Sequence, residues 1–240
     1  MKSFNDNLAY INQLMIDEYA FAQTKEDFSD TKSNYHLLSN KGRYLFDTSD
    51  LNYKLNGLID NLDLIEVFLT SYEPLKFKEN KINEIDHINY HLEVYYHKIH
   101  TILELMKLAT NEIFQLGIPY KDCNWENIQK KKDIIDSNVL DIIDRYYKSF
   151  KSSISVRHHN THRASNVNPS SHILSIKLSL LENSNSSNFI SAVEVGKDIQ
   201  KHRDEKSNMI KKGKAIAKRY VDEFNFEIIR EMVRRVETLE

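Results

Sequence analysis

The scarcity of residues that form tight turns is the feature that most constrains the fold of this chain. The sequence contains only 5 glycines and 3 prolines in 240 residues. Sheet proteins need many tight turns, and those turns favour glycine and proline. We therefore predict an all-α protein. At 28.3 kDa the chain is long enough to bury a sizeable core, as one domain or as a domain with an appendage.

Apolar residues that repeat every three to four positions indicate where the helices lie. This spacing predicts helices over residues 5–23, 51–74, 79–116, 139–157, 171–181 and 189–240. Gly117 and Pro119 follow the third of these segments as helix stop signals. The last segment is predicted as one helix, or as two helices that break near Gly213 or Asn225.

The helix pattern also suggests a domain organisation. We expect residues 1–75 to form an N-terminal helical extension that packs on an up-and-down helical bundle built from residues 76–240. The single Cys123 cannot form an internal disulfide, which fits a reducing cytoplasm. The N-terminus lacks the apolar core of a signal peptide, and there is no stretch of 18 apolar residues, so we expect a cytoplasmic protein without a membrane span.

One local motif carries most of the functional information: Arg157-His158-His159-Asn160-Thr161-His162. An arginine stands five residues before a histidine, with a polar residue directly after the arginine. The motif lies in a window, residues 145–181, that contains no Asp or Glu. The same window carries six cationic residues, namely Arg145, Lys148, Lys151, Arg157, Arg163 and Lys177. We therefore predict that an anion binds here, and phosphate is the commonest relevant anion.

An arginine and a histidine are the groups needed to cleave RNA without a metal. The 2′-hydroxyl attacks the neighbouring phosphorus while a general base takes its proton and an acid assists the leaving 5′-oxygen. His162 has the side-chain type whose ordinary pKa lies near working pH. Arg157 can hold the phosphoryl oxygens with two parallel hydrogen bonds. We expect Arg157 and His162 to be catalytic and no cofactor or metal to be required.

Helix geometry restricts how these two residues can cooperate. Five residues turn through about 500°, so positions 157 and 162 lie about 140° apart on a straight helix. Three arrangements would bring them to one phosphate. The helix ends or kinks between them, the long arginine side chain reaches around the helix, or two copies of the chain close one site as a symmetric dimer.

The motif in an all-helical chain resembles that of the HEPN superfamily, with His158 at the family's usual Asn, Asp or His position. The segment 90–117, aromatic-rich and ending Phe114-Gln115-Leu116-Gly117-Ile118, also resembles the long helix before the motif in bacterial members. The resemblance implies a dimerising helical bundle and a metal-independent ribonuclease, often in toxin–antitoxin or phage-defence systems with a protein antitoxin or neutraliser. It implies Arg157 and His162 as the catalytic pair and His158 as a supporting group. We add Asn160 as a supporting residue and Arg145, Lys148, Lys151 and Arg163 as RNA-binding residues.

Several alternatives use the same residues. His158 and His162 have the i, i+4 spacing of metal ligands, with His172 or His202 as remote third ligands. His87 and His91 have the same spacing on the third predicted helix, where a structural role is the main interpretation. The basic run Lys201 to Arg219 is interpreted as a solvated face, or as an extension of an RNA-binding groove if it packs beside the motif.

Aromatic residues near the motif have two interpretations as well. Tyr146, Tyr147 and Phe150 have helical spacing and fit core packing better than stacking on RNA bases. Two other functions compete with cleavage: the same site binds RNA or a nucleotide without cutting it, or the chain is a purely structural interaction protein.

Overall fold

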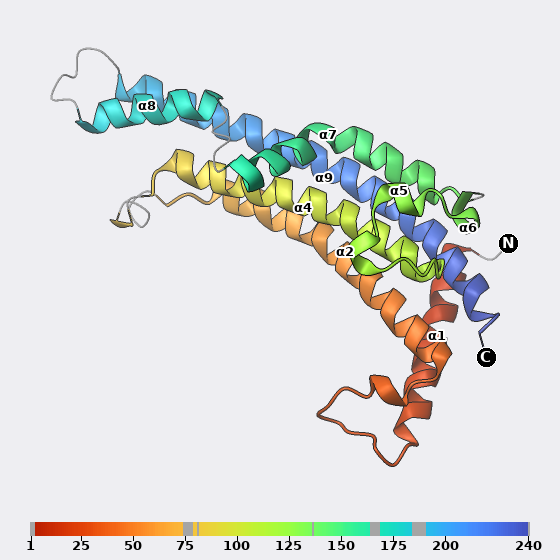
Figure 1. Cartoon of the computed structure of the whole chain (residues 1–240). Coiled ribbons are helices and arrows are strands. Elements are labelled where there is room, and N and C mark those ends of the chain that lie inside the picture. Colours follow the sequence, from red (N-terminus) through yellow and green to blue (C-terminus); the bar gives the residue numbers. More distant parts are fainter. Residues whose placement is uncertain are drawn as a thin grey trace. The chain divides into compact units, whose positions relative to one another are not determined.

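The computed structural model describes residues 3–73, 79–80, 82–135, 137–163, 169–183 and 191–239. Every regular element in these ranges is a helix, which confirms the predicted all-α fold (Figure 1). The chain divides into two compact units. Unit 1 comprises residues 1–57, 102–149 and 219–240, and unit 2 comprises residues 58–101 and 150–218. Four long helices contribute residues to both units: α2 (Asn40–Thr70), α4 (Glu84–Ile113), α7 (Val139–Arg163) and α9 (Ala192–Val236).

Unit 1 contains further elements besides its parts of the long helices. These elements are α1 (Phe4–Gln23), α5 (Trp125–Ile128), α6 (Lys132–Ile135) and the single-turn 3₁₀ helices η1 (Tyr35–Leu37) and η2 (Tyr120–Asp122). The largest fully buried side chains of this unit are Leu45, Leu55, Ile102, Met106, Tyr146 and Phe224. Tyr146 and Phe150 are buried, which confirms their predicted packing role, whereas Tyr147 is 42% exposed.

The first two helices begin at side chains that satisfy free backbone N–H groups. Ser3 and Asp6 form a reciprocal capping box at the start of α1. The second helix begins at Asn40, about ten residues before the predicted start. The Ser39 hydroxyl accepts a hydrogen bond from the Gly42 N–H (2.9 Å) and donates one to Glu18 (2.7 Å). This cap lies in a polar segment with no apolar spacing, so the sequence pattern did not reveal it.

The third long helix ends three residues before its predicted end at residue 116. Helix α4 ends at Ile113, and Gln115 (φ 52°) and Gly117 (φ 64°) take left-handed conformations just after it. The Ile113 carbonyl, which has no partner within the helix, accepts a hydrogen bond from the Tyr44 hydroxyl (3.0 Å). The Asn111 side chain then holds the Ile118 backbone through both its N–H (3.0 Å) and its carbonyl (2.9 Å).

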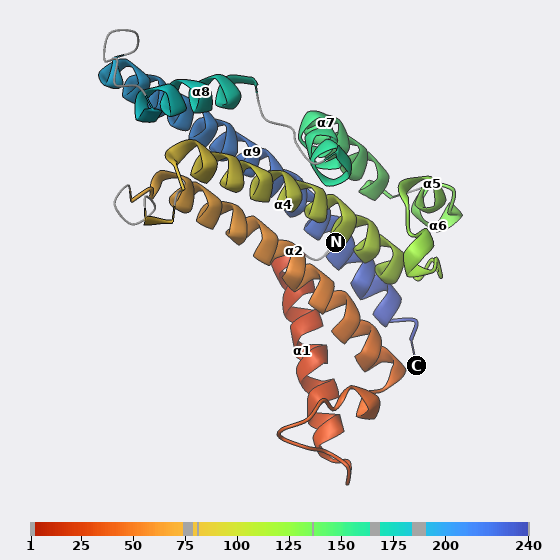
Figure 2. The same cartoon turned by 60° about the vertical axis from the view of Figure 1, so that its left-hand side comes forward.

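Contacts within unit 2 give the directions of its helices. Phe68 near the end of α2 contacts His91 near the start of α4, so α2 and α4 run antiparallel, as Figures 1 and 2 also show. Helix α9 pairs Arg203 with Glu84 (2.8 Å) and places Gly213 beside Tyr95, so it runs parallel to α4. Helix α8 (Pro169–Asn183) runs antiparallel to α9, since Ser171 contacts His202 (3.1 Å) and Lys177 pairs with the earlier Asp198 (2.7 Å).

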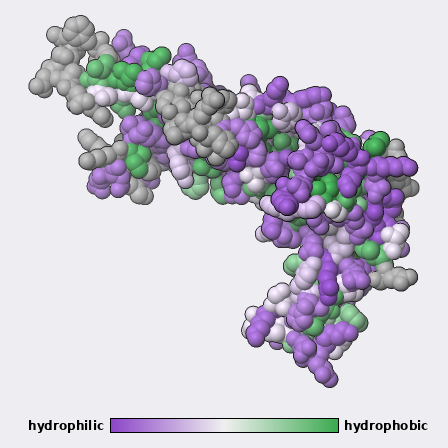
Figure 3. All heavy atoms as spheres, in the orientation of Figure 1, coloured by the Kyte–Doolittle hydropathy of each residue, from purple (hydrophilic) through white to green (hydrophobic). Residues whose placement is uncertain are grey.

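Some apolar side chains of unit 2 reach the surface. Ile173 (55% exposed), Ile176 (47%) and Leu180 (51%) form a stripe along α8 at helical spacing. Apolar atoms are visible on the surface near α8 in Figure 3. Within the described residues, none of the helices combines the length and the apolar character needed to cross a bilayer.

The last helix is continuous from Ala192 to Val236, which confirms the one-helix alternative and excludes a break near Gly213 or Asn225. The reason for a glycine at 213 is a close approach to another side chain. A Cβ at this position would overlap the hydroxyl of Tyr95, which is itself only 2% exposed. Gly213 therefore lets α9 pack directly against the buried ring on α4.

We predict that Gly213→Ala lowers the free energy of unfolding by about 1–3 kcal/mol, because the added methyl group forces buried atoms apart. Gly196→Ala on the same helix is the matched control. Nothing lies within 4 Å of a Cβ at 196, so this change should stabilise the protein by about 0.5–1 kcal/mol through helix propensity. Urea denaturation measures both. Equal effects of the two substitutions would contradict the packing described here, and Tyr95→Phe should partly rescue Gly213→Ala.

Candidate functional site

The Arg-x₄-His motif lies near the end of helix α7, which continues without a break to Arg163. The first of the three predicted arrangements, a helix end or kink between residues 157 and 162, is therefore wrong. The i→i−4 hydrogen-bonded spiral instead keeps positions 157 and 162 about 140° apart around the axis. Position 162 falls one turn after position 158 on the same side of the helix. The side chains of 159–163 are outside the described residues, so His162, Asn160 and Arg163 are located by their backbone alone.

Arg157 is half-buried and contacts the residue that follows it. Its Nη1 lies 3.4 Å from Nδ1 of the exposed His158, which is a long hydrogen bond in which the guanidinium donates. A donor at Nδ1 requires the imidazole to keep its own proton on Nε2. Of the two neutral tautomers of His158, this contact is compatible with the one that carries its proton on Nε2.

A second imidazole reaches the motif from another helix of the same unit. The ring of His100 on α4 meets the ring of His158 edge to face, with centroids 5.3 Å apart and planes at 86°. Helices α4 and α7 can be followed in Figure 2. Arg157, His158 and His100 are all in unit 2. The structure thus places a guanidinium and two imidazoles in sequential contact.

His100 is the candidate site residue that we did not single out from the sequence. It is one of four histidines on α4, which also carries Asp86, Glu93 and Glu104, and such a mixture of residues is typical of a solvated helix face. The only sequence signal would have been its place on the long helix before the motif. The spacing of residues along α4 does not show which turn of that helix lies against α7.

Two of the four predicted RNA-binding residues have carboxylate partners in unit 1. Arg145 donates to Asp141 (2.7 Å) and to Glu223 of α9 (2.8 Å), and these contacts raise its pKa further. Lys148 lies 2.5 Å from Asp144. The acid-free window is therefore not free of acids in space, because its first residues face carboxylates that precede it or belong to α9.

The remaining cations of the window are Lys151, Lys177 and Arg163. Lys151 is exposed on α7, and its RNA-binding role stays a prediction. Lys177 pairs with Asp198 at 2.7 Å. The RNA-binding role predicted for Arg163 stays a prediction as well.

The structure gives other surroundings to the histidines considered as metal ligands. Among the described residues there is no group of three or more His, Cys, Asp or Glu side chains with the geometry of a metal site. His202 is buried on α9 and shares a hydrogen bond with Ser171 of α8 (3.1 Å), and burial, followed by Lys206, lowers its pKa. His172 is exposed on α8.

The His87–His91 pair lies in a packed contact between α2 and α4. His87 is 8% exposed, and its Nε2–H donates to the Phe68 carbonyl near the end of α2 (2.8 Å). The two rings meet edge to face at 4.5 Å, and Phe68 stacks on His91 at 6.1 Å. Burial, and next the neighbouring His87, lower the pKa of His91 to about 4. These contacts explain the pair as a link between α2 and α4.

The basic run on α9 is only partly a solvated face. In unit 2, Arg203 pairs with Glu84 at 2.8 Å, Lys211 pairs with Glu66 at 3.3 Å, and Lys214 pairs with Asp63. These ion pairs connect α9 with α2 and α4. Lys201, Lys212 and Lys218 are exposed.

Comparison with known proteins identifies the family to which the chain belongs. The family model of Cthe2314-like HEPN domains matches residues 45–225, which is more than half of the chain and includes the whole motif. No curated protein and no solved structure matches the chain. The match includes residues 45–75, and the predicted division of the chain at residue 75 remains a prediction. With an all-α fold, a complete motif on α7 and this match, the chain belongs to the HEPN family of the Cthe2314-like type.

Proposed function

We propose that this protein is a metal-independent endoribonuclease that cleaves RNA through attack of the 2′-hydroxyl on the adjacent phosphorus. The observation that carries the proposal is the complete motif on one uninterrupted helix within the family match. Family membership alone indicates an RNA- or nucleotide-related function without naming a reaction. The contact chain from Arg157 through His158 to His100 supports the choice of phosphodiester chemistry.

Arg157 has the role of stabilising charge on phosphorus. Negative charge grows on the two non-bridging oxygens as the 2′-oxygen attacks, and a guanidinium can bind both of them. Arg157 is half-buried on α7, where it contacts His158. A preorganised donor of this kind contributes about 10²- to 10³-fold in rate.

Two proton transfers accompany the exchange of the 2′-oxygen for the 5′-oxygen. The P–O2′ bond forms as the 2′-hydroxyl proton leaves, and the P–O5′ bond breaks as the 5′-oxygen gains a proton. His162 is the proposed base for the first transfer. His100, which the ring contact brings to His158, is the proposed acid for the second. His158 and Asn160 are proposed to support these groups.

A dimer is the assembly that best suits the continuous helix. One straight helix does not direct positions 157 and 162 to the same point, so either the long arginine reaches around α7 or a second copy completes the site. We favour a homodimer in which each copy contributes to one site. We also propose a toxin–antitoxin or phage-defence setting in the cytoplasm with a protein neutraliser. A site that binds RNA without cutting it is the main alternative.

We predict that purified wild-type protein cleaves RNA in the presence of EDTA. Arg157→Ala should lower the rate by about 10²- to 10³-fold, and His162→Ala by about 10²- to 10⁴-fold. Lys54→Ala removes an exposed lysine that pairs with Asp50 on α2 (2.6 Å), and it should leave the rate within about twofold. The measurement is the initial rate of cleavage of a labelled single-stranded RNA.

Three results of this assay would count against the proposal. Loss of cleavage on addition of EDTA alone would indicate a metal-dependent reaction. Salt-sensitive binding with intact RNA after long incubation would favour the binding alternative. Equal rates in wild type and both motif variants would place the activity elsewhere.

We further predict that His100→Ala removes one limb of the pH–rate profile and lowers kcat by about 10²- to 10⁴-fold, because one of the two proton transfers loses its group. Added imidazole should restore part of the rate. His97→Ala is the matched control, since His97 lies on the same helix beside Glu93 (3.8 Å) and is given no part in the reaction. A His100→Ala protein that keeps both limbs and the wild-type rate would exclude proton transfer by His100.

A further inference from the structure

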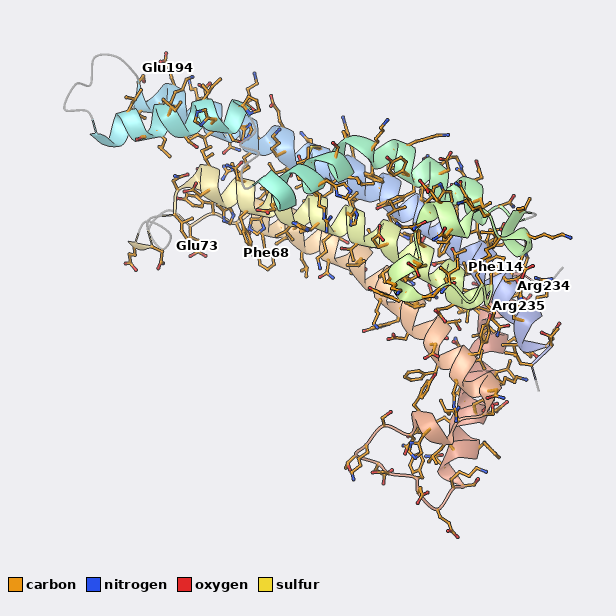
Figure 4. All side chains as sticks on the ribbon, viewed as in Figure 1. Phe68, Glu73, Phe114, Glu194, Arg234 and Arg235 are labelled. Carbon is orange, nitrogen blue, oxygen red and sulfur yellow. The ribbon has the colours of Figure 1, made fainter. Side chains whose placement is uncertain are left out.

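A second cationic site lies in unit 1, on residues that the proposed reaction does not use. A hollow of about 770 Å³ is lined by charged side chains of α6 and the end of α9. Its cations are Lys132, Arg230, Arg234 and Arg235, and its acids are Asp133 and Glu231. Figure 4 shows Arg234 and Arg235 close to Phe114, a buried residue that also lines the hollow.

Buried carboxylates hold the arginines of this hollow in place. The side chain of Glu231 is 11% exposed, and it accepts two hydrogen bonds from Arg234 (2.8 and 2.6 Å) and one from Arg235 (2.7 Å). The side chain of Glu227 is 9% exposed and accepts from Arg230 at 2.6 Å. A guanidinium that is already oriented loses little side-chain freedom when it binds a ligand.

The charges of the hollow do not cancel. Among the described residues that line the hollow, four cations face two acids, which leaves a formal charge of +2, and counting Glu227 leaves +1. The three oxygen–nitrogen contacts at Glu231 use both of its oxygens. Asp133 lies 3.7 Å from Arg235 and is 59% exposed, so water screens this pair. The excess charge is therefore positive and open to solvent.

The arginines also keep unused donors. Arg234 binds Glu231 through Nε and Nη2, and its Nη1 has no protein hydrogen-bond partner among the described residues. Its side chain is 65% exposed. Arg230 binds Glu227 through Nη2 alone and is 43% exposed. Each guanidinium has five N–H donors in a fixed fork, so both can bind a carboxylate on one edge and a ligand on another.

We propose that this hollow binds a phosphate-bearing ligand through Arg230 and Arg234, with Lys132 as a further cation. Phosphate presents several acceptor oxygens at the spacing of a guanidinium fork and more charge than a carboxylate, and both properties fit adjacent arginines with free edges. Arg230, Arg234 and Arg235 lie beyond residue 225, where the family match ends. Lys132 and Phe114 lie within the match, so only the arginine side of the hollow is outside it. The test of the site does not depend on RNA cleavage.

The experiment is isothermal titration calorimetry of the full chain with pyrophosphate at low salt. Wild-type protein should bind, and the double variant Arg230→Gln/Arg234→Gln should lose about 100-fold in affinity, since each substitution removes charge-assisted hydrogen bonds. Arg219→Gln is the matched control, because Arg219 is an exposed arginine of α9 that pairs with Glu223 (3.8 Å) and lines no part of the hollow. It should bind as the wild type does.

Lys132→Gln is a second variant that leaves all the arginine–glutamate pairs intact, and it should weaken binding about threefold to tenfold. Comparing pyrophosphate with 2′-O-methyl oligoribonucleotides that carry or lack a 5′-phosphate distinguishes a free or terminal phosphate from an RNA backbone. No binding of any of these probes by the wild type would overturn the proposal. Equal affinity in the wild type and the folded double variant would do so as well.

Discussion

The packing of other helices against α9 is the interaction on which each unit depends. In unit 1, α9 meets α1 through the Phe4–Phe226 stack (6.1 Å) and, through Glu227, accepts a hydrogen bond from Asn138, the residue before α7 (3.1 Å). In unit 2, it meets α4 where Gly213 leaves room for Tyr95. The helix supplies buried apolar residues along its whole length, from Val195 to Val236. Because α9 has no break, its part in each unit offers an uninterrupted helix face against which apolar side chains are buried.

The unbroken course of α7 restricts how the proposed active site can form. An unbroken α7 positions Arg157 and His162 with a fixed angular offset, so the helix does not by itself direct both side chains to one phosphate. The residues that converge within unit 2 are instead Arg157, His158 and His100. A site of this kind needs groups from more than one helix or from more than one copy. The proposed dimer and the proposed role of His100 both follow from this restriction.

Spacing within the sequence predicted the elements better than it predicted their contacts. The all-α class and the first helix depend on local chemistry, and the structure confirms them. Helix α4 ends at Ile113, three residues before the predicted end and close to the predicted stop at Gly117. The start of α2 was missed because its cap, the Ser39 hydroxyl that accepts from the Gly42 N–H, stands in a polar segment without apolar spacing. The Glu18 side chain that holds Ser39 comes from a distant position.

The same limit applies to the site. The motif itself is a local pattern and was visible in the sequence. The neutralisation of Arg145 by Glu223 and the approach of His100 to His158 join residues 78 and 58 positions apart. Apolar periodicity shows which face of a helix is buried, and it does not specify which turn of another helix lies against it. Those pairings therefore required the three-dimensional structure.

The chemistry of the cleaved ends tests the central claim most directly. Attack by a 2′-hydroxyl leaves a 2′,3′-cyclic phosphate on one fragment and a 5′-hydroxyl on the other, and mass spectrometry of the fragments distinguishes these ends from their alternatives. The account predicts cyclic phosphate ends, and no cut at a nucleotide whose 2′-hydroxyl is replaced by hydrogen. Fragments with 3′-hydroxyl and 5′-phosphate ends, or cleavage at the deoxy position, would contradict it.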